Sequence, residues 1–541
     1  MRIRSSMLHR LLVAAVALLV ADGAAAANHF YVPFTLSLSA GGDKGVWLAD
    51  TDHLGNPPYQ ITNQVLDAGG QVAVLDDWSY NAVSHMATNV QPQMLVYGLN
   101  GHLYKVDLHR IQPVAQYSSG SYTELCSLTA LDERPFAAAK AYVQAVVEPV
   151  GSVNDCASGL GTQTWLIPAG ADAATAPMIQ PAHWTVLGAF TDPTDDSFVR
   201  WVVWTGNSVD AYKANFSSHT TLLVGPPAGP APSVLGRQDG VAFLVSPSDD
   251  GTNHTDALYR VTMTGSGLVT SFSYADSSPC TGFTGGSFTD PSAGTLLFAE
   301  PTSAGYTVYS TPLAGGLPTA IYADASGGEC AGLGGDGPSA AHLGLNEVDM
   351  STGFQHVIVI SEAGPVSQTP VLVAGGGANQ NAFLRYTIAG RYWVDVRDFS
   401  SSPVQYTEVV ADGDGSIAAT YANSRIGDDI WGGFRPSGAA AQIERDFVYL
   451  FSPNLTPCTG GSLAAIEPVG LTSTAISGVP ADACSTLAYG WLPASVGYVQ
   501  QAGGSSPVEI DPVGGKMYLL LGPDPDGTFQ NLSLLPGYPF F

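Results

Sequence analysis

Short apolar and aromatic runs recur along the whole chain, each bounded by Gly, Pro, Asn or Asp. Runs of this kind between turn-forming residues are typical of β-strands. Most are followed by a turn and a second run, and the leading runs lie mostly about 40 to 60 residues apart. Helical periodicity is almost absent, and residues 133–147 are the one stretch that could form a helix, which we do not expect. The clearest leading runs are residues 94–97, 201–204, 241–245, 296–298, 357–360, 392–394, 447–450 and 517–520.

This spacing matches the length of a four-stranded propeller blade. We therefore predict an all-β fold in which residues 28–541 form a single β-propeller of about seven or eight four-stranded blades. Tandem β-sandwiches are the alternative, because they also combine short strands with Gly- and Pro-rich turns. In a propeller, residues 30–36 and 519–534 are the segments we expect to close the ring.

One unit carries a resemblance to a known repeat. Residues 288–299 place Asp290-Pro291 and Gly294 before the apolar run 296–298, and Tyr306 leads to a Gly-Gly pair at residues 315–316. This unit resembles the blade repeat of TolB-like (PD40-type) propellers, in which a turn precedes an apolar strand and a Tyr…Gly-Gly hairpin ends it. The resemblance is best over residues 288–318 and looser elsewhere. It implies blade geometry and no site residue.

The first 27 residues have the features of a signal peptide. Three Arg residues precede an apolar stretch at residues 11–21, and the small residues 24–27 follow. A positive n-region, an apolar core and an A-x-A pattern are the marks of a secretory signal. We expect cleavage after Ala26 or Ala27 and a secreted mature chain in the periplasm, on the cell surface or outside the cell. A retained membrane anchor is the alternative.

The cysteine count is even, as expected for disulfides in an exported chain. The sequence around Cys280 recurs around Cys458, and the sequence around Cys156 recurs around Cys330. These similarities favour sequential pairing among the fifteen pairings that six cysteines allow. Metal binding is the rival interpretation, but the sequence has no C-x-x-C motif. The expected pairs are Cys126–Cys156, Cys280–Cys330 and Cys458–Cys484.

The charge balance excludes some partners. The chain carries 46 Asp+Glu against 19 Lys+Arg, a formal net charge of -27. A nucleic-acid backbone or an anionic membrane surface requires a dense cationic face, so neither is an expected partner. The sequence also has no G-x-S-x-G elbow, no H-E-x-x-H and no P-loop. No motif requires a cofactor, although propeller active sites are assembled from residues far apart in sequence.

Acidic loops are the candidate metal sites. Closely spaced carboxylates with glycines between them can wrap a calcium ion. The alternative is that Asp favours turns and keeps the surface soluble. Neither of the two best candidate loops completes an EF-hand pattern. These loops contain Asp412 with Asp414, and Asp524 with Asp526.

The His, Trp, Tyr and Arg residues give weaker indications of a functional site. Ten His residues are scattered through the mature chain, and His102 and His109 flank one strand with poor metal geometry. Trp and Tyr could stack on sugar rings at a channel mouth, or they could simply pack between blades. Arg residues gather between 385 and 435, where a salt bridge to a local Asp competes with binding of a carboxylate or sulfate.

Two functions fit these observations. The first is a secreted or cell-surface, non-catalytic propeller that binds a protein or a glycan. The second is a propeller enzyme, a glycoside hydrolase or lyase, that acts on an extracellular polysaccharide. The enzyme requires carboxylates about 5 to 9.5 Å apart, or a His, Tyr or Arg group with a cation, facing one pocket.

Overall fold

The computed structural model describes most of the chain after the predicted signal peptide. Within the described ranges there are 39 strands and no helix, hence no helix that could cross a membrane. These ranges are residues 31–36, 45–50, 53–67, 72–81, 86–108, 115–116, 121–131, 142–151, 156, 161–168, 178–180, 184–192, 195–213, 219–224, 231–238, 240–262, 265–280, 286–290, 293–324, 327–333, 341–426, 448–452, 461–490, 495–501 and 504–521.

The strands form ten antiparallel sheets that follow one another along the chain, one of three strands and nine of four. The first five sheets contain β1 (Tyr31–Leu36), β2 (Gly45–Asp50) and β3 (Tyr59–Thr62); β4 (Val72–Asn81), β5 (Met86–Leu99), β6 (His102–Asp107) and β7 (Ala115–Gln116); β8 (Tyr122–Leu131), β9 (Tyr142–Pro149), β10 (Gln163–Pro168) and β11 (Met178–Gln180); β12 (Thr185–Asp192), β13 (Asp195–Trp204), β14 (Ser208–Lys213) and β15 (His219–Val224); and β16 (Ser233–Gln238), β17 (Val241–Asp249), β18 (Asn253–Thr262) and β19 (Gly265–Ala275).

The remaining five sheets have the same up-and-down order, in which each strand pairs with the strands before and after it. They contain β20 (Ser287–Asp290), β21 (Thr295–Pro301), β22 (Tyr306–Pro312) and β23 (Thr319–Ala323); β24 (Glu329–Leu333), β25 (His342–Asp349), β26 (Gln355–Ser361) and β27 (Val371–Ala374); β28 (Gln380–Ile388), β29 (Arg391–Asp398), β30 (Gln405–Asp412) and β31 (Ile417–Ala422); β32 (Arg425–Ile426), β33 (Val448–Ser452), β34 (Ser462–Ile466) and β35 (Ser473–Ile476); and β36 (Ala483–Gly490), β37 (Ser495–Gln501), β38 (Gly504–Asp511) and β39 (Lys516–Leu519).

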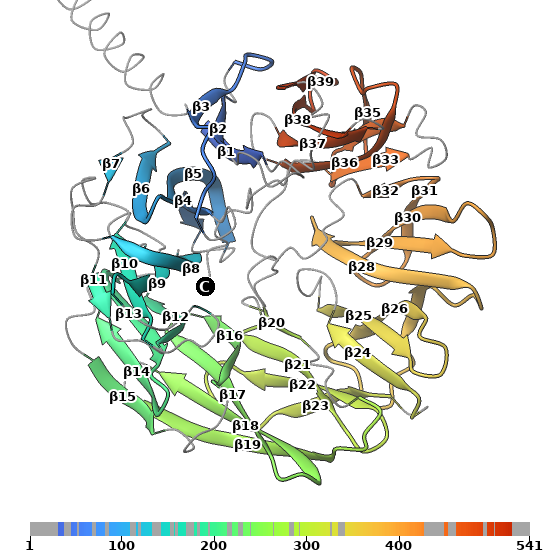
Figure 1. Cartoon of the computed structure of the whole chain (residues 1–541). Coiled ribbons are helices and arrows are strands. Elements are labelled where there is room, and N and C mark those ends of the chain that lie inside the picture. Colours follow the sequence, from blue (N-terminus) through green and yellow to red (C-terminus); the bar gives the residue numbers. More distant parts are fainter. Residues whose placement is uncertain are drawn as a thin grey trace, which may run out of the picture.

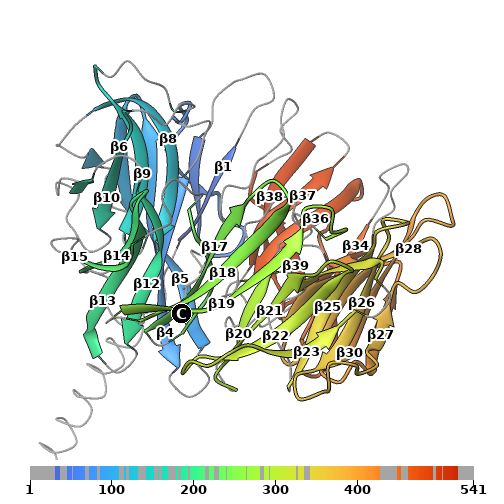
Figure 2. The same cartoon turned by 90° about the horizontal axis from the view of Figure 1, so that it is seen from below.

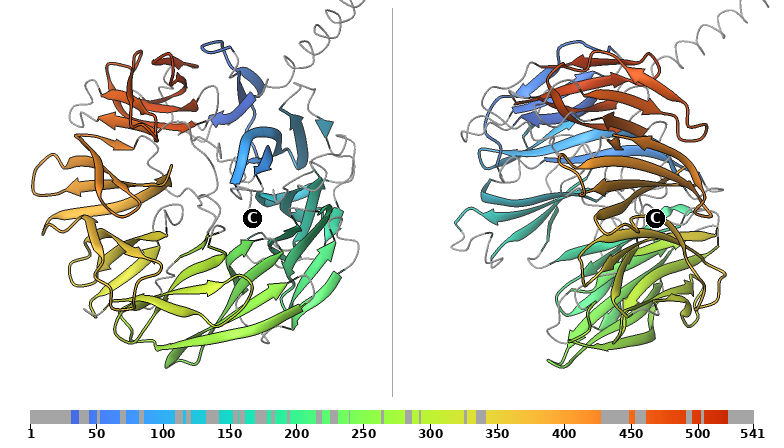
Figure 3. Two further views of the ribbon diagram at one scale, coloured as in Figure 1. Left: turned by 180° about the vertical axis from the view of Figure 1, so that it is seen from behind. Right: turned by 90° about the vertical axis from the view of Figure 1, so that its right-hand side faces the viewer.

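The sheets are arranged in a ring, which makes the fold a β-propeller (Figure 1). Side views show the strands running through the thickness of the ring (Figures 2 and 3). The expected number of about seven or eight blades was too low. In the part of the chain that the structure describes, the first strands of the ten sheets begin 41 to 63 residues apart, from Tyr31 to Ala483, so the predicted spacing holds.

The two ends of the ring meet sheet against sheet. The N-terminal sheet lies beside the C-terminal one, and the Gly55 backbone N–H donates to Glu509 Oε2 at 2.8 Å (Figure 1). β1 pairs with β2 inside its own sheet and with no C-terminal strand. The described contact between the two end sheets comes from the β2–β3 turn, so closure of the ring by residues 30–36 stays a prediction. Residues 522–534 of the other closing segment lie outside the described residues.

The core lies between neighbouring sheets. One cluster joins Leu297 and Ile321 of the β20–β23 sheet to Leu343 and Ile358 of the β24–β27 sheet. Because the middle strands are covered on both faces, their apolar runs are continuous rather than alternating, as in the buried run of β21. In most sheets, the apolar runs predicted from the sequence lie in these middle strands.

Two of the three expected disulfides lie in described residues, and both are present. Cys126 of β8 is bonded to Cys156, and Cys280 is bonded to Cys330 of β24. The second disulfide closes a loop that contains the whole β20–β23 sheet. Cys458 lies outside the described residues, and its pairing with Cys484 stays a prediction.

Candidate functional site

Two carboxylates and an imidazole meet at one end of the β24–β27 sheet. Glu329 begins β24, Glu347 lies near the end of β25, and His356 lies near the start of β26. Glu347 and His356 face each other across the β25–β26 hairpin. His356 Nε2 lies 2.7 Å from Glu347 Oε2 and 3.5 Å from Glu329 Oε2. We call these three residues the Glu–Glu–His cluster.

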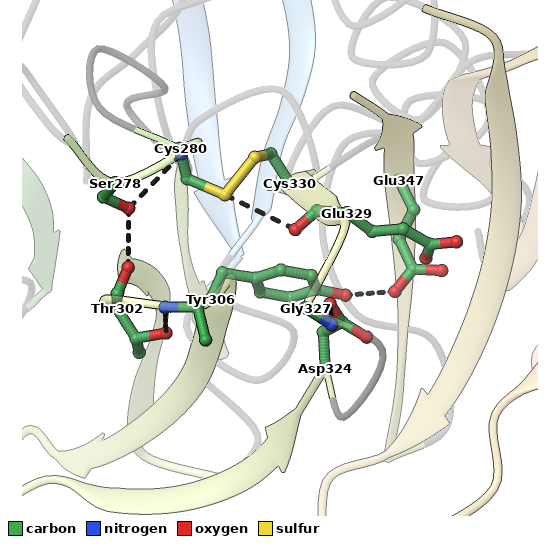
Figure 4. The surroundings of a disulfide bond; sticks show 10 residues. Ser278, Cys280, Thr302, Tyr306, Asp324, Gly327, Glu329, Cys330 and Glu347 are labelled. Carbon is green, nitrogen blue, oxygen red and sulfur yellow. Dashed lines mark hydrogen bonds between the residues drawn. A yellow bond between two sulfur atoms is a disulfide. The ribbon is translucent and has the colours of Figure 1, made fainter. Parts of the chain in front are cut away.

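The neighbouring sheet holds the deepest member of the cluster. Glu347 is only 2% exposed, and its Oε1 accepts hydrogen bonds from the Tyr306 hydroxyl of β22 and, at 3.3 Å, from the Tyr322 hydroxyl of β23. The Cys280–Cys330 disulfide adjoins Glu329 (Figure 4). Glu347 is therefore fixed through one oxygen, and its other oxygen faces His356.

A cleft of about 430 Å³ opens onto this cluster. Its polar side chains include Glu329, His356, Asp349 and Thr352, and its apolar side chains are Phe354 and Leu372; residues 375–378 complete the wall. We call it the Glu329 cleft.

An ordered turn and a glycine shape this cleft. Asp349 accepts hydrogen bonds from the N–H and hydroxyl of Ser351 and from the Thr352 hydroxyl, which orders the β25–β26 turn. Gly375 has a φ of +92°, and a Cβ there would lie 2.7 Å from His356 Cα. A glycine is thus required where the cleft wall passes His356.

Burial and charge shift the titration of the cluster. Burial raises the pKa of Glu329 to about 7; the adjacent Glu347 charge adds to the rise and His356 opposes it. The hydrogen bond to Glu347 raises the pKa of His356, against the effect of burial. Burial, and then the Glu347 charge, raises the pKa of Tyr306 and Tyr322, so both hydroxyls stay protonated and donate at neutral pH. Near pH 7 the Glu329 carboxyl can both donate and accept a hydrogen bond.

The acidic loops predicted to bind calcium have local partners. Asp412 Oδ1 accepts a hydrogen bond from Arg391 Nε at 2.8 Å. Asp414 Oδ1 accepts from the N–H and hydroxyl of Ser416, which lowers the pKa of its carboxyl. Asp524 and Asp526 lie outside the described residues. The calcium interpretation stays a prediction for all four.

The Arg residues singled out from the sequence are paired with nearby Asp where their side chains are described. Arg385 and Arg397 both donate to Asp395 Oδ2, and Arg391 pairs with Asp412. The local salt bridge is therefore the correct interpretation for these three. The fully buried Trp201 and Trp393 likewise pack in the core.

The sequence alone missed the Glu–Glu–His cluster. Its members are spread over 28 residues with no known motif, and only the strand register brings them together. A usable signal was present in the hairpin: Glu347 and His356 lie close to either end of the turn that contains Asp349 and Gly353. Residues at such paired positions are neighbours on the same face of a sheet.

Comparison with known proteins assigns no family. No protein-family model matches the chain, and no curated protein matches it. Among solved structures, the chain is similar to a eukaryotic initiation factor, with 11% identity and a TM-score of 0.42 over 82% of this chain and 96% of that one. It is also similar to dipeptidyl peptidase 4 from Porphyromonas gingivalis, with 9% identity and a TM-score of 0.38 over 84% and 60%.

A third similarity is to oligopeptidase B from Leishmania major, with 11% identity and a TM-score of 0.35 over 69% of this chain. The match spans about half of that enzyme, 53% of its length. Similarity at this level assigns no activity to the chain.

Proposed function

We propose that the protein is an exported, non-catalytic β-propeller that binds an extracellular glycan in the Glu329 cleft. The observation that carries this proposal is the composition of the cleft. Phe354 supplies an apolar face for a sugar ring, while Glu329 and His356 supply hydrogen-bonding groups for its hydroxyls. The volume of about 430 Å³ lies within the range of small-ligand sites.

The burial of Glu347 supports binding over cleavage. Glycoside hydrolysis by a carboxylate pair requires both carboxylates to reach the substrate. Glu347 is only 2% exposed, and its two oxygens are engaged by Tyr306, Tyr322 and His356. Glu347 therefore does not line the Glu329 cleft and lies out of reach of a bound glycan.

Export is part of the proposal. The signal-peptide features of residues 1–27 support it, and so do the two disulfides, because disulfides persist in oxidising compartments. The final location is the periplasm, the cell surface or the medium.

The test is a glycan array probed with the labelled mature chain, followed by calorimetric titration of the glycans retained. Phe354→Ala removes the aromatic wall and should weaken binding by up to about ten-fold, since an aromatic contact contributes about 0.5–1.5 kcal/mol. Tyr59→Ala is the matched control, because Tyr59 is an aromatic residue, 51% exposed, on the distant strand β3. An array that retains no glycan, or an equal loss in both variants, would overturn the proposal.

One observation favours the enzyme as a second candidate. Glu329 borders the cleft, and its pKa of about 7 suits a general acid at neutral pH. An enzyme would release new reducing ends or unsaturated products from the bound glycan, and Glu329→Gln would abolish that release. A wild-type protein that binds the glycan and leaves it intact rejects this candidate.

A further inference from the structure

The ligand atoms of the Glu–Glu–His cluster lie close enough together to share one metal ion. One oxygen of Glu329, one oxygen of Glu347 and one ring nitrogen of His356 all lie within 4.8 Å of one another. The three residues come from three adjacent hydrogen-bonded strands, β24, β25 and β26. Their spacing is therefore set by the sheet and not by a loose surface loop.

Glu347 is held as a metal-binding carboxylate is commonly held. Groups that bind a metal are usually oriented by hydrogen bonds to their other polar atom. The Tyr306 and Tyr322 hydroxyls donate to Oε1 of Glu347, so Oε2 is the oxygen presented to His356. The Cys280–Cys330 disulfide anchors the strand that carries Glu329.

Two carboxylates of the cluster face a single imidazole. Glu329 and Glu347 share one ion-pair partner, His356. A divalent ion placed between the three side chains would neutralise two carboxylates and let the imidazole bind in its neutral form.

We propose that Glu329, Glu347 and His356 bind a zinc ion at the floor of the Glu329 cleft. One imidazole nitrogen with two carboxylates is a ligand set for zinc, whereas calcium prefers oxygen ligands alone. Tetrahedral zinc at about 2.0–2.1 Å from each ligand places the ligand atoms about 3.3 Å apart. His356 and Glu347 would separate from 2.7 Å to that distance, and the spacing of His356 to Glu329, 3.5 Å, already fits.

Three protein ligands leave one position of a tetrahedral ion open. Glu329 and His356 also line the cleft, so water or an oxygen of a molecule in the cleft would supply the fourth ligand. The proposal that a glycan hydroxyl or carboxylate is the fourth ligand rests on the proposed function. The zinc site itself is independent of that function.

The test measures zinc directly. The mature chain is stripped with EDTA, dialysed against zinc chloride and assayed for bound metal by mass spectrometry. We expect one zinc per chain at this site. The affinity should be about a hundred-fold weaker in His356→Ala, which removes a direct ligand, and clearly weaker in Glu329→Gln, which replaces an anionic ligand by a neutral amide. Tyr322→Phe leaves all three ligands in place and should weaken zinc about ten-fold.

His254→Ala is the matched control, since His254 also lies 3.2 Å from a carboxylate, that of Asp256, outside the cluster. It should bind zinc as the wild type does. Thermal melting of each metal-free variant confirms that it is folded. Cobalt substitution adds a spectroscopic signature: the visible absorption of the bound cobalt should vanish in His356→Ala.

Two results would overturn the site: no zinc retained by the wild type, or equal zinc retained by the wild type, His356→Ala and Glu329→Gln. Glycan titration with and without zinc separates this inference from the proposed function. If the cluster binds zinc but the array retains no glycan, the zinc site is supported and the proposed glycan-binding function is rejected. If the chain binds no zinc and its glycan binding is unchanged after EDTA, the proposed function is supported and the zinc site is rejected.

Discussion

A buried carboxyl group away from the cleft makes the stability of the ring depend on pH. Glu300 lies near the end of β21 and is only 5% exposed. Burial, with a contribution from the Asp256 charge, raises its pKa from 4.5 to about 8. The native state therefore keeps this proton at neutral pH, where the unfolded chain has lost it.

The sign of the effect follows from this difference. Below the unfolded pKa of 4.5 both states hold the proton, and the contribution of Glu300 to stability is fully present. As pH rises toward the native pKa of about 8, only the unfolded state ionises, and that contribution is lost. At about 1.36 kcal/mol per pH unit, the free energy of unfolding falls by about 4 kcal/mol between pH 5 and pH 8.

Glu300→Gln cannot ionise and should remove this part of the pH dependence. The assay is urea unfolding at pH 5 and pH 8 for the wild type, for Glu300→Gln and for the control Glu124→Gln, whose side chain on β8 is exposed. We expect the wild type and the control to lose several kcal/mol at pH 8, and Glu300→Gln to lose about 4 kcal/mol less. The same pH slope in all three proteins would refute the reasoning.

Three further changes have expected outcomes. Replacing Cys280 and Cys330 by Ser opens a loop with a sequence separation of 50 and should lower the free energy of unfolding by about 4 kcal/mol in denaturant titrations. Leu297→Ala should cost about 2–5 kcal/mol because Leu297 is fully buried, whereas Leu317→Ala, at a side chain 73% exposed, should change stability by less than about 0.5 kcal/mol. Gly375→Ala should destabilise by about 1–3 kcal/mol through its φ of +92° and should also weaken glycan binding, since the new Cβ meets the backbone at the cleft wall; unchanged affinity by calorimetry would contradict the second part.

The strand pattern was predictable because of how a propeller buries its sheets. The middle strands are covered on both faces, so their sequences are continuous apolar runs that stand out between turns. The unit that resembles the TolB-like repeat, residues 288–318, covers the first three strands of one sheet and ends just before β23. Its Gly-Gly pair lies between β22 and β23, where Gly315 and Gly316 have φ values of +110° and +140°. Residues 142–147, at the end of the only possible helix, belong to strand β9, where tertiary pairing decides the structure.

The site was not predictable, for a different reason. Local sequence similarity was enough to pair Cys280 with Cys330, because the segments around the cysteines recur along the chain. The Glu–Glu–His cluster carries no such repeat: Glu329, Glu347 and His356 become neighbours only when β24, β25 and β26 pair in one register. The Tyr306 hydroxyl then arrives from the neighbouring sheet, a contact that strand periodicity does not specify.

Hydrogen exchange with and without a glycan retained on the array tests the central claim most directly. If the glycan occupies the Glu329 cleft, amide protection should increase in the β25–β26 turn, residues 350–354, and in the cleft wall, residues 372–378, while the N-terminal sheet stays unchanged. Protection that appears on another sheet and leaves both cleft segments unchanged would contradict the account.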